Sequence, residues 1–313
     1  MDIEVTGPAG VLPVSVVIPT YNRPAMTRRA VLSALGQHPQ SPAEVIVVDD
    51  CSTDDTRWVA AEAGARVIRH ESNQGEGAAR NTGVAAATQP WLGLLDSDDE
   101  WMPHLLATLW ALRDGHVLVA GSAMVRSDEP GWERYAGPGR QRSRRLRSPA
   151  ALIYPGNILP NSGVLVRTEV VRAVGGYDPK LRFGADLDLW LRVLEAGTGI
   201  VSPEIVVDYH HHPGQVTADR RSMARAQLAI LQAYVERPWW SRTRVEAWRG
   251  AAAWDELRRR LTGEPPRSVV APVLFILRNP VRFLGVLGIL SYRRRMRQRT
   301  AQMRPREERS AST

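Results

Sequence analysis

Short apolar runs alternate with helical patterns along the first 120 residues of the chain. Apolar runs of strand length occupy residues 14–18, 45–48, 66–69, 91–95 and 117–120. Segments with helical periodicity lie between them, at residues 24–35, 53–63, 77–87 and 103–112. This alternation predicts an α/β fold with a parallel sheet.

The pattern changes after residue 120. Residues 127–148 are rich in glycine and arginine, which is typical of an exposed loop. A strand at 163–167, a helix at 168–174 and an amphipathic helix at 186–196 follow, and 219–261 is again helical. We therefore expect three parts. They are a domain over 1–218 with halves 12–120 and 121–218, a helical extension over 219–265, and an apolar and basic segment over 266–313.

The composition suits an enzyme with a large core. The chain has 313 residues, of which 43% are hydrophobic, and carries a net charge of +8 that is nearly all arginine. No nucleic-acid-binding motif accompanies that charge, so we do not expect a nucleic-acid partner. The single cysteine, Cys51, excludes an internal disulfide framework and suits a reducing compartment. The first residues carry acid where a signal peptide carries base, so we expect a cytoplasmic protein.

Acidic side chains follow two of the predicted strands. Asp49 and Asp50 end the second strand, and Asp96, Asp98 and Asp99 follow the strand at 91–95. Ligands of an open α/β sheet bind at this carboxyl edge. In an extended segment Asp96 and Asp98 would share one side, and two carboxylates directed at one spot suit Mg²⁺ or Mn²⁺. The alternative is a solvated acidic turn.

Seven motifs in order carry a family resemblance. They are VSVVIPTYNR from Val14, VVDDCSTDDT from Val47, NQGEGAARN from Asn73, DSDD from Asp96, NSG from Asn161, GGYD from Gly175 and DLDLWLR from Asp186. Together they resemble the family 2 glycosyltransferases, which are inverting enzymes of the GT-A fold. The resemblance implies a Rossmann-like mixed, mainly parallel sheet flanked by helices. It also implies transfer of a sugar from a nucleotide-diphosphate donor, with UDP-sugars favoured, to a hydroxyl of a glycan or lipid-linked acceptor.

The resemblance also implies roles for individual residues. Asp98 would bind the metal, and His212 would contact the metal or the diphosphate. The remaining donor-binding residues would be Thr20, Asp50, Arg80 and Asp96. Two alternatives stay open: an internal salt bridge from Arg80 to the DSDD turn, and a loop histidine at 212 that packs on an aromatic ring.

Asp186 is the predicted catalytic base. Inverting transfer needs a carboxylate that takes the proton of the acceptor hydroxyl, and an aspartate with a pKa near ~3.9 is ionised at neutral pH. The family usually has glutamate before this aspartate, whereas this chain has Ala185, which leaves the acceptor class open. The alternative role for Asp186 is that of a helix cap.

Two other functions remain open. A sugar nucleotidylyltransferase would need basic residues in the first loop, where Arg23 stands alone. A non-catalytic nucleotide- or glycan-binding module would not need the full set of acids.

The C-terminal segment has two interpretations. Residues 269–290 are apolar but interrupted by prolines and arginines, so they fall short of the ~20 apolar residues of a spanning helix. Clustered arginines follow at 293–299. One interpretation is peripheral contact with the inner face of the plasma membrane. The other is a helix packed on the catalytic domain, followed by a disordered basic tail.

Overall fold

The computed structural model describes residues 10–127, 133–137, 142–153, 157–212, 220–262, 273 and 276–303. The predicted domain boundary at 218 and most of the segment 266–275 lie outside these residues, so the domain division stays a prediction.

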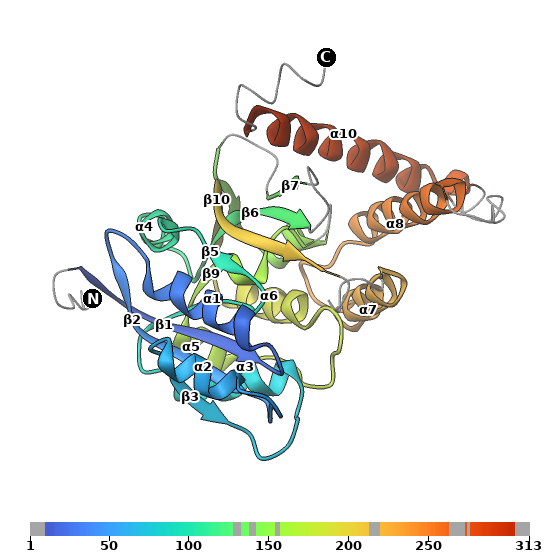
Figure 1. The fold of residues 1–313 in the computed structure, drawn as a ribbon. Helices are drawn as coiled ribbons and strands as arrows, with labels where there is room; N and C mark the ends of the chain where they lie inside the picture. The colour runs from blue at the N-terminus through green and yellow to red at the C-terminus, as the bar shows by residue number, and fades with distance from the viewer. Residues whose placement is uncertain are drawn as a thin grey trace.

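One mixed sheet organises the molecule (Figure 1). Its strands are β1 (Val11–Thr20), β2 (Ser41–Asp49), β3 (Arg66–Arg69), β4 (Trp91–Leu94), β5 (Glu100–Trp101), β6 (Leu118–Ser127), β7 (Glu133–Ala136), β8 (Arg144–Leu146), β9 (Val164–Arg167) and β10 (Gly199–His211). The order is β3-β2-β1-β4-β9-β6-β10-β5, with β7 on β6 and β8 on β10. Strands β3, β2, β1 and β4 are parallel, as the alternation predicts.

The second half of the sheet departs from the parallel pattern. Strand β9 runs antiparallel between β4 and β6, and β5 runs antiparallel to β10, while β6 and β10 are parallel. The loop prediction for 127–148 is wrong in part, because β7 and β8 lie within it. Strand β8 has a single apolar residue among its arginines, Leu146, so its composition does not indicate a strand. Leu146 is fully buried where β8 pairs with β10.

Helices cover both faces of the sheet, and each face has its own apolar core. The helices of this part are α1 (Pro24–Leu35), α2 (Thr56–Glu62), α3 (Glu76–Ala86), α4 (Leu105–Trp110), α5 (Thr168–Ala173) and α6 (Ala185–Ala196). Residues of α1 and α4 join one core, and residues of α3, α5 and α6 join the other. The near-continuous apolar run of β1 fits a strand that is buried on both sides.

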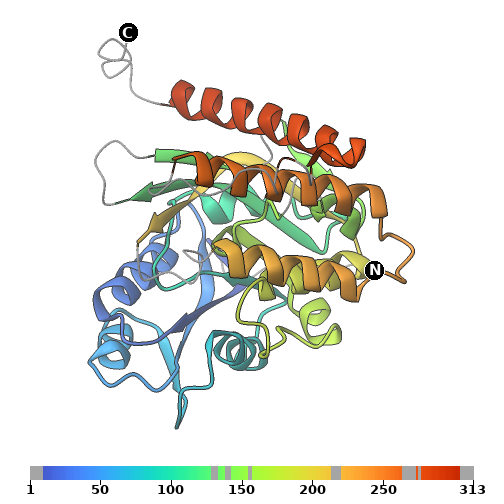
Figure 2. The ribbon, with the colours of Figure 1, turned by 90° about the vertical axis from the view of Figure 1, so that its right-hand side faces the viewer.

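The predicted helical extension is present. Helix α7 (Arg220–Ala233) packs through Ile230 and Leu231 on the core that includes α6, and Val245 and Trp248 of α8 (Arg242–Thr262) join the same core. Helix α10 (Pro280–Met303) lies along α8 (Figure 2). No helix among the described residues is both long enough and apolar enough to cross a membrane.

Candidate active site

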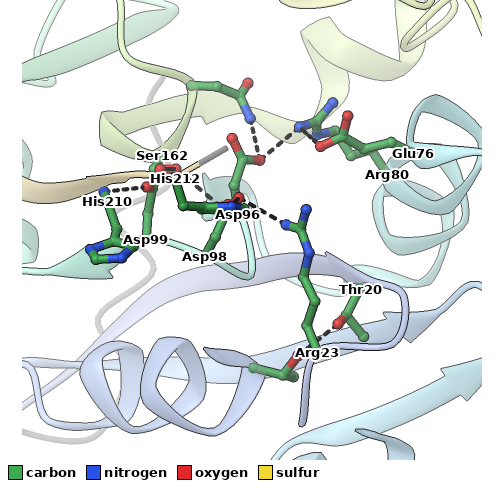
Figure 3. A network of polar contacts seen from close by, with 12 residues as sticks. Thr20, Arg23, Glu76, Arg80, Asp96, Asp98, Asp99, Ser162, His210 and His212 are labelled. Carbon is green, nitrogen blue, oxygen red and sulfur yellow. Dashed lines mark hydrogen bonds and ion pairs between the residues drawn. The ribbon is translucent and has the colours of Figure 1, made fainter. Parts of the chain in front are cut away.

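The acids after β4 form a turn rather than an extended segment. Residues 95–99 leave the strand, so the alternation expected for them does not apply. Asp96 and Asp98 therefore contact two separate groups of partners (Figure 3). Asp99 is 1% exposed, and its carboxylate accepts hydrogen bonds from the Ser162 hydroxyl and the backbone N–H of His210. Asp99 thereby fixes the turn, because it ties β4 to β10.

Asp98 lies between a histidine and an arginine. Its Oδ2 is 3.0 Å from Nε2 of His212, which follows β10, and 2.8 Å from Nη1 of Arg23, which precedes α1. The rings of His210 and His212 stack with centroids 6.1 Å apart, as expected for residues i and i+2 of a strand. The two residues that the family resemblance implies as metal ligands therefore lie in contact, while their metal role stays a prediction; the sequence assigned no role to Arg23 in the acidic site.

These two side chains fit a divalent cation that keeps open positions. Ligands of octahedral Mg²⁺ at ~2.1 Å in neighbouring positions lie about 3 Å apart, which is close to the 3.0 Å between Asp98 and His212. Within the described residues, no three His, Cys, Asp or Glu side chains converge on one point. The protein would therefore supply few ligands and leave the rest to phosphate and water oxygens.

Asp96 is the centre of a second network. Its Oδ1 accepts hydrogen bonds from Nη2 of Arg80 at 2.7 Å and from Nδ2 of Asn161 at 2.9 Å. Arg80 also bonds Glu76 at 2.6 Å, one turn earlier on α3. The internal salt bridge considered for Arg80 is therefore the contact that the structure shows. Tyr177 donates to Asn161 at 3.0 Å, so the NSG and GGYD motifs both reach the DSDD turn.

Asp50 and Thr20 are both buried, and each is bonded within the protein. The Asp50 carboxylate accepts hydrogen bonds from the backbone N–H groups of Gln74 and Gly75 at 2.9 and 2.8 Å, and its Oδ1 lies 2.7 Å from Nδ1 of His70. It thereby holds the turn at Gly75, where φ is +90°, at the start of α3. The Thr20 hydroxyl lies 2.6 Å from the hydroxyl of Thr27 in α1. Their donor contacts stay predictions.

Asp186 lies in the first turn of α6. Gly184, with φ of +75°, takes the capping position, so the helix-cap alternative for Asp186 is not supported. Its Oδ2 accepts a hydrogen bond from Nδ2 of Asn157 at 2.7 Å. Burial raises the pKa of Asp186 and the charge of Asp96 adds to the rise, while the helix N–H of Leu187 and the charge of Arg80 oppose it.

The neighbouring acid on α6 has a different environment. Asp188 bonds Arg192 at 2.6 Å and accepts a hydrogen bond at 2.7 Å from the hydroxyl of Tyr234, which directly follows α7. It is thus engaged with the helical extension, whereas Asp186 is within electrostatic reach of Asp96 and Arg80.

Solved structures with this architecture are glycosyltransferases. One is S. aureus TarS 1–349 in complex with UDP-GlcNAc, with a TM-score of 0.59 and 19% identity over 79% of this chain and 72% of that one. Another is the mannosyltransferase PcManGT from Pyrobaculum calidifontis with GDP-Man and Mn²⁺, with a TM-score of 0.59 and 18% identity over 90% of this chain and 84% of that one. These similarities show that the chain has the GT-A fold.

The chain belongs to glycosyl transferase family 2, whose model matches residues 15–174. The succinoglycan biosynthesis protein ExoO of Rhizobium meliloti is 32% identical over 248 residues, 71% of this chain and 68% of ExoO. The pre-mycofactocin glycosyltransferase of Mycobacterium tuberculosis is 32% identical over 213 residues, which are 65% of this chain but only 43% of that relative's length. The predicted family, GT-A fold and enzyme class are confirmed.

Proposed function

We propose that this enzyme transfers a sugar from a nucleotide-diphosphate donor, with a UDP-sugar favoured, to a hydroxyl of a glycan or lipid-linked acceptor, with inversion. The supporting observation is that the Asp98–His212 pair, the Asp96 network and Asp186 occupy one edge of the sheet. The names of the relatives support the donor class, since TarS binds UDP-GlcNAc and PcManGT binds GDP-Man.

Asp98 and His212 would hold Mg²⁺ or Mn²⁺ in this proposal. The cation would neutralise the negative charge that develops on the departing diphosphate. His212 must present an unprotonated Nε2 to bind it. Replacing Asp98 by Asn should therefore weaken Mn²⁺ binding and donor binding together, by about ten-fold or more. Calorimetry checks this, and Asp114→Asn is the matched control, because it changes an acid whose side chain is 85% exposed and pairs with Arg113.

Asp186 would accept the proton of the acceptor hydroxyl. As the hydroxyl oxygen bonds to the anomeric carbon, the bond from that carbon to the diphosphate breaks and the proton moves to a carboxylate oxygen. Asn157 holds Oδ2 of Asp186 in place and so fixes the orientation of the carboxylate. A pKa raised by burial brings this base closer to the working pH, which favours proton transfer.

The test is release of nucleotide diphosphate from a panel of nucleotide sugars with Mn²⁺ and candidate acceptors. A transferase releases UDP or GDP, a nucleotidylyltransferase makes or consumes pyrophosphate, and a binding module does neither. Asp186→Asn should lower the rate by ~10² to 10⁴ and leave nucleotide affinity unchanged. Asp188→Asn is the matched control on the same helix and should retain transfer. Retention of more than about a tenth of the parental rate by Asp186→Asn would contradict the assignment.

The proposed location is the cytoplasm. The sole cysteine, Cys51, fits a reducing compartment. With a lipid-linked acceptor, the enzyme would work at the inner face of the plasma membrane.

A further inference from the structure

Helix α10 is the outermost helix of the molecule in both views (Figures 1 and 2). Its inner face is fixed against α8 by close backbone contact, since a Cβ added at Gly285 would lie 2.1 Å from the carbonyl oxygen of Ala247. Val286 and Ile289 are buried on the same side, and Arg282 forms an ion pair with Glu246 of α8 at 2.6 Å. These contacts determine which side of α10 faces outward.

The outward side of α10 carries an uncovered apolar stripe. Its members are Phe283, Leu284, Leu287 and Leu290, with exposed fractions of 45, 63, 48 and 39%. Leu277, just before the helix, is 64% exposed. These five are half of the ten large apolar side chains that are exposed among the described residues. Such a concentration on one helix marks a contact surface rather than scattered surface residues.

The charge on the same helix indicates what the stripe contacts. Arg294, Arg295 and Arg297 are exposed and follow the stripe along the helix, while the α10 sequence contains no Asp or Glu. A second copy of α10 packed on the stripe would offer these arginines no carboxylate, because the helix contains none. An anionic lipid surface instead offers hydrocarbon to the leucines and phosphate to the arginines.

We propose that the outer face of α10, from Phe283 to Arg297, docks the enzyme on an anionic membrane surface, together with Leu277 just before the helix. The apolar stripe enters the boundary of headgroups and acyl chains, and the arginines bind lipid phosphates. This inference concerns location and holds whatever donor and acceptor the enzyme uses. A binding assay without substrates therefore separates its failure from a failure of the proposed transferase activity.

The test is flotation of the full-length protein with two kinds of vesicle. We expect binding to phosphatidylcholine vesicles containing about 30% phosphatidylglycerol, much weaker binding to pure phosphatidylcholine, and release as salt shortens the Debye length. The double substitution Leu284→Ser with Leu287→Ser should weaken binding at least about ten-fold. Arg294→Gln with Arg295→Gln should weaken it about 25-fold, at about five-fold for each arginine.

Matched controls come from exposed residues elsewhere. Leu32→Ser on α1 removes an apolar side chain that is 41% exposed, and Arg28→Gln with Arg66→Gln removes the same charge from the other end of the molecule. Both controls should bind vesicles like the parent. Equal flotation of parent and α10 variants would overturn the proposal. A concentration-dependent dimer that is lost in the leucine variant, without vesicle binding by the parent, would also overturn it in favour of self-association.

Discussion

The ion pair between Arg23 and Asp98 leads to a quantitative prediction about metal affinity. Nη1 of Arg23 contacts the same Asp98 oxygen that lies next to His212. A cation bound by Asp98 and His212 must therefore displace this guanidinium. Replacing Arg23 by Gln removes both the competitor and its charge, so Mn²⁺ should bind more tightly in the absence of nucleotide.

The magnitude follows from the exposure of the pair. Two charges ~4 Å apart interact by about 4 kcal/mol at an effective dielectric constant of 20. The Arg23 side chain is 31% exposed, and fully exposed pairs contribute only ~0.2 to 1 kcal/mol. We therefore take the interaction between Arg23 and Asp98 as ~1 to 2 kcal/mol. Its loss in Arg23→Gln corresponds to about 5- to 30-fold tighter Mn²⁺ binding.

The assay is titration of the apoenzyme with Mn²⁺, with free Mn²⁺ measured by electron paramagnetic resonance. Arg29→Gln is the control, because Arg29 lies on α1, the helix that directly follows Arg23 in the chain, and pairs with Glu100 at the surface. Its Mn²⁺ affinity should equal that of the parent. Unchanged or weaker Mn²⁺ binding by folded Arg23→Gln would refute the argument that arginine and cation compete for Asp98.

Three further predictions concern Asp186 and the helical extension. Burial and Asp96 raise the pKa of Asp186 against the opposing charge of Arg80, in a site that also holds the Tyr177 hydroxyl. The rate should therefore fall as pH falls through this raised pKa, and the parental pH–rate profile should show that acid limb. A raised pKa stabilises the fold below pH ~4, and that stability is lost as pH rises through the pKa of the folded state. Asp186→Asn avoids this loss, so it should unfold at a higher temperature than the parent at about pH 7. Calorimetric scans should show the difference in unfolding temperature shrinking near pH ~4. Gly285→Leu should separate α10 from α8, because even a Cβ at this position would lie 2.1 Å from the backbone of α8. We expect faster amide hydrogen exchange confined to residues 242–262 and 276–303. Unchanged exchange in these residues would contradict the prediction.

The sequence is most informative where polar motif residues directly follow a predicted strand. The parallel strands and the amphipathic helix α6 follow from local pattern, and the family resemblance draws attention to Asp98 and His212, which the fold brings into contact. The orientation of the carboxylates in the DSDD turn could not be predicted from the sequence, because it depends on Ser162 and His210, which lie far along the chain.

Contacts between segments that lie far apart in the sequence account for the other features that the sequence did not predict. Asn157 and Asp186 are 29 positions apart, and Arg23 and Asp98 are 75 apart, so no local periodicity connects them. The antiparallel insertion of β9 between β4 and β6 likewise depends on tertiary pairing. The asparagine and tyrosine of the NSG and GGYD motifs are visible in the sequence, but only the fold shows that Asn161 bonds Asp96 and that Tyr177 bonds Asn161.

The contacts between α6 and the C-terminal helical extension limit how this enzyme can be engineered. Tyr234 bonds Asp188, and Ile230 lies so close to Gly184 that a Cβ there would meet it at 2.9 Å. The helix that carries Asp186, the proposed base, is thus supported by the C-terminal extension. A chimaera that exchanges C-terminal regions between relatives should therefore be joined beyond Tyr234, because an earlier junction would take away part of the support for the helix that carries Asp186.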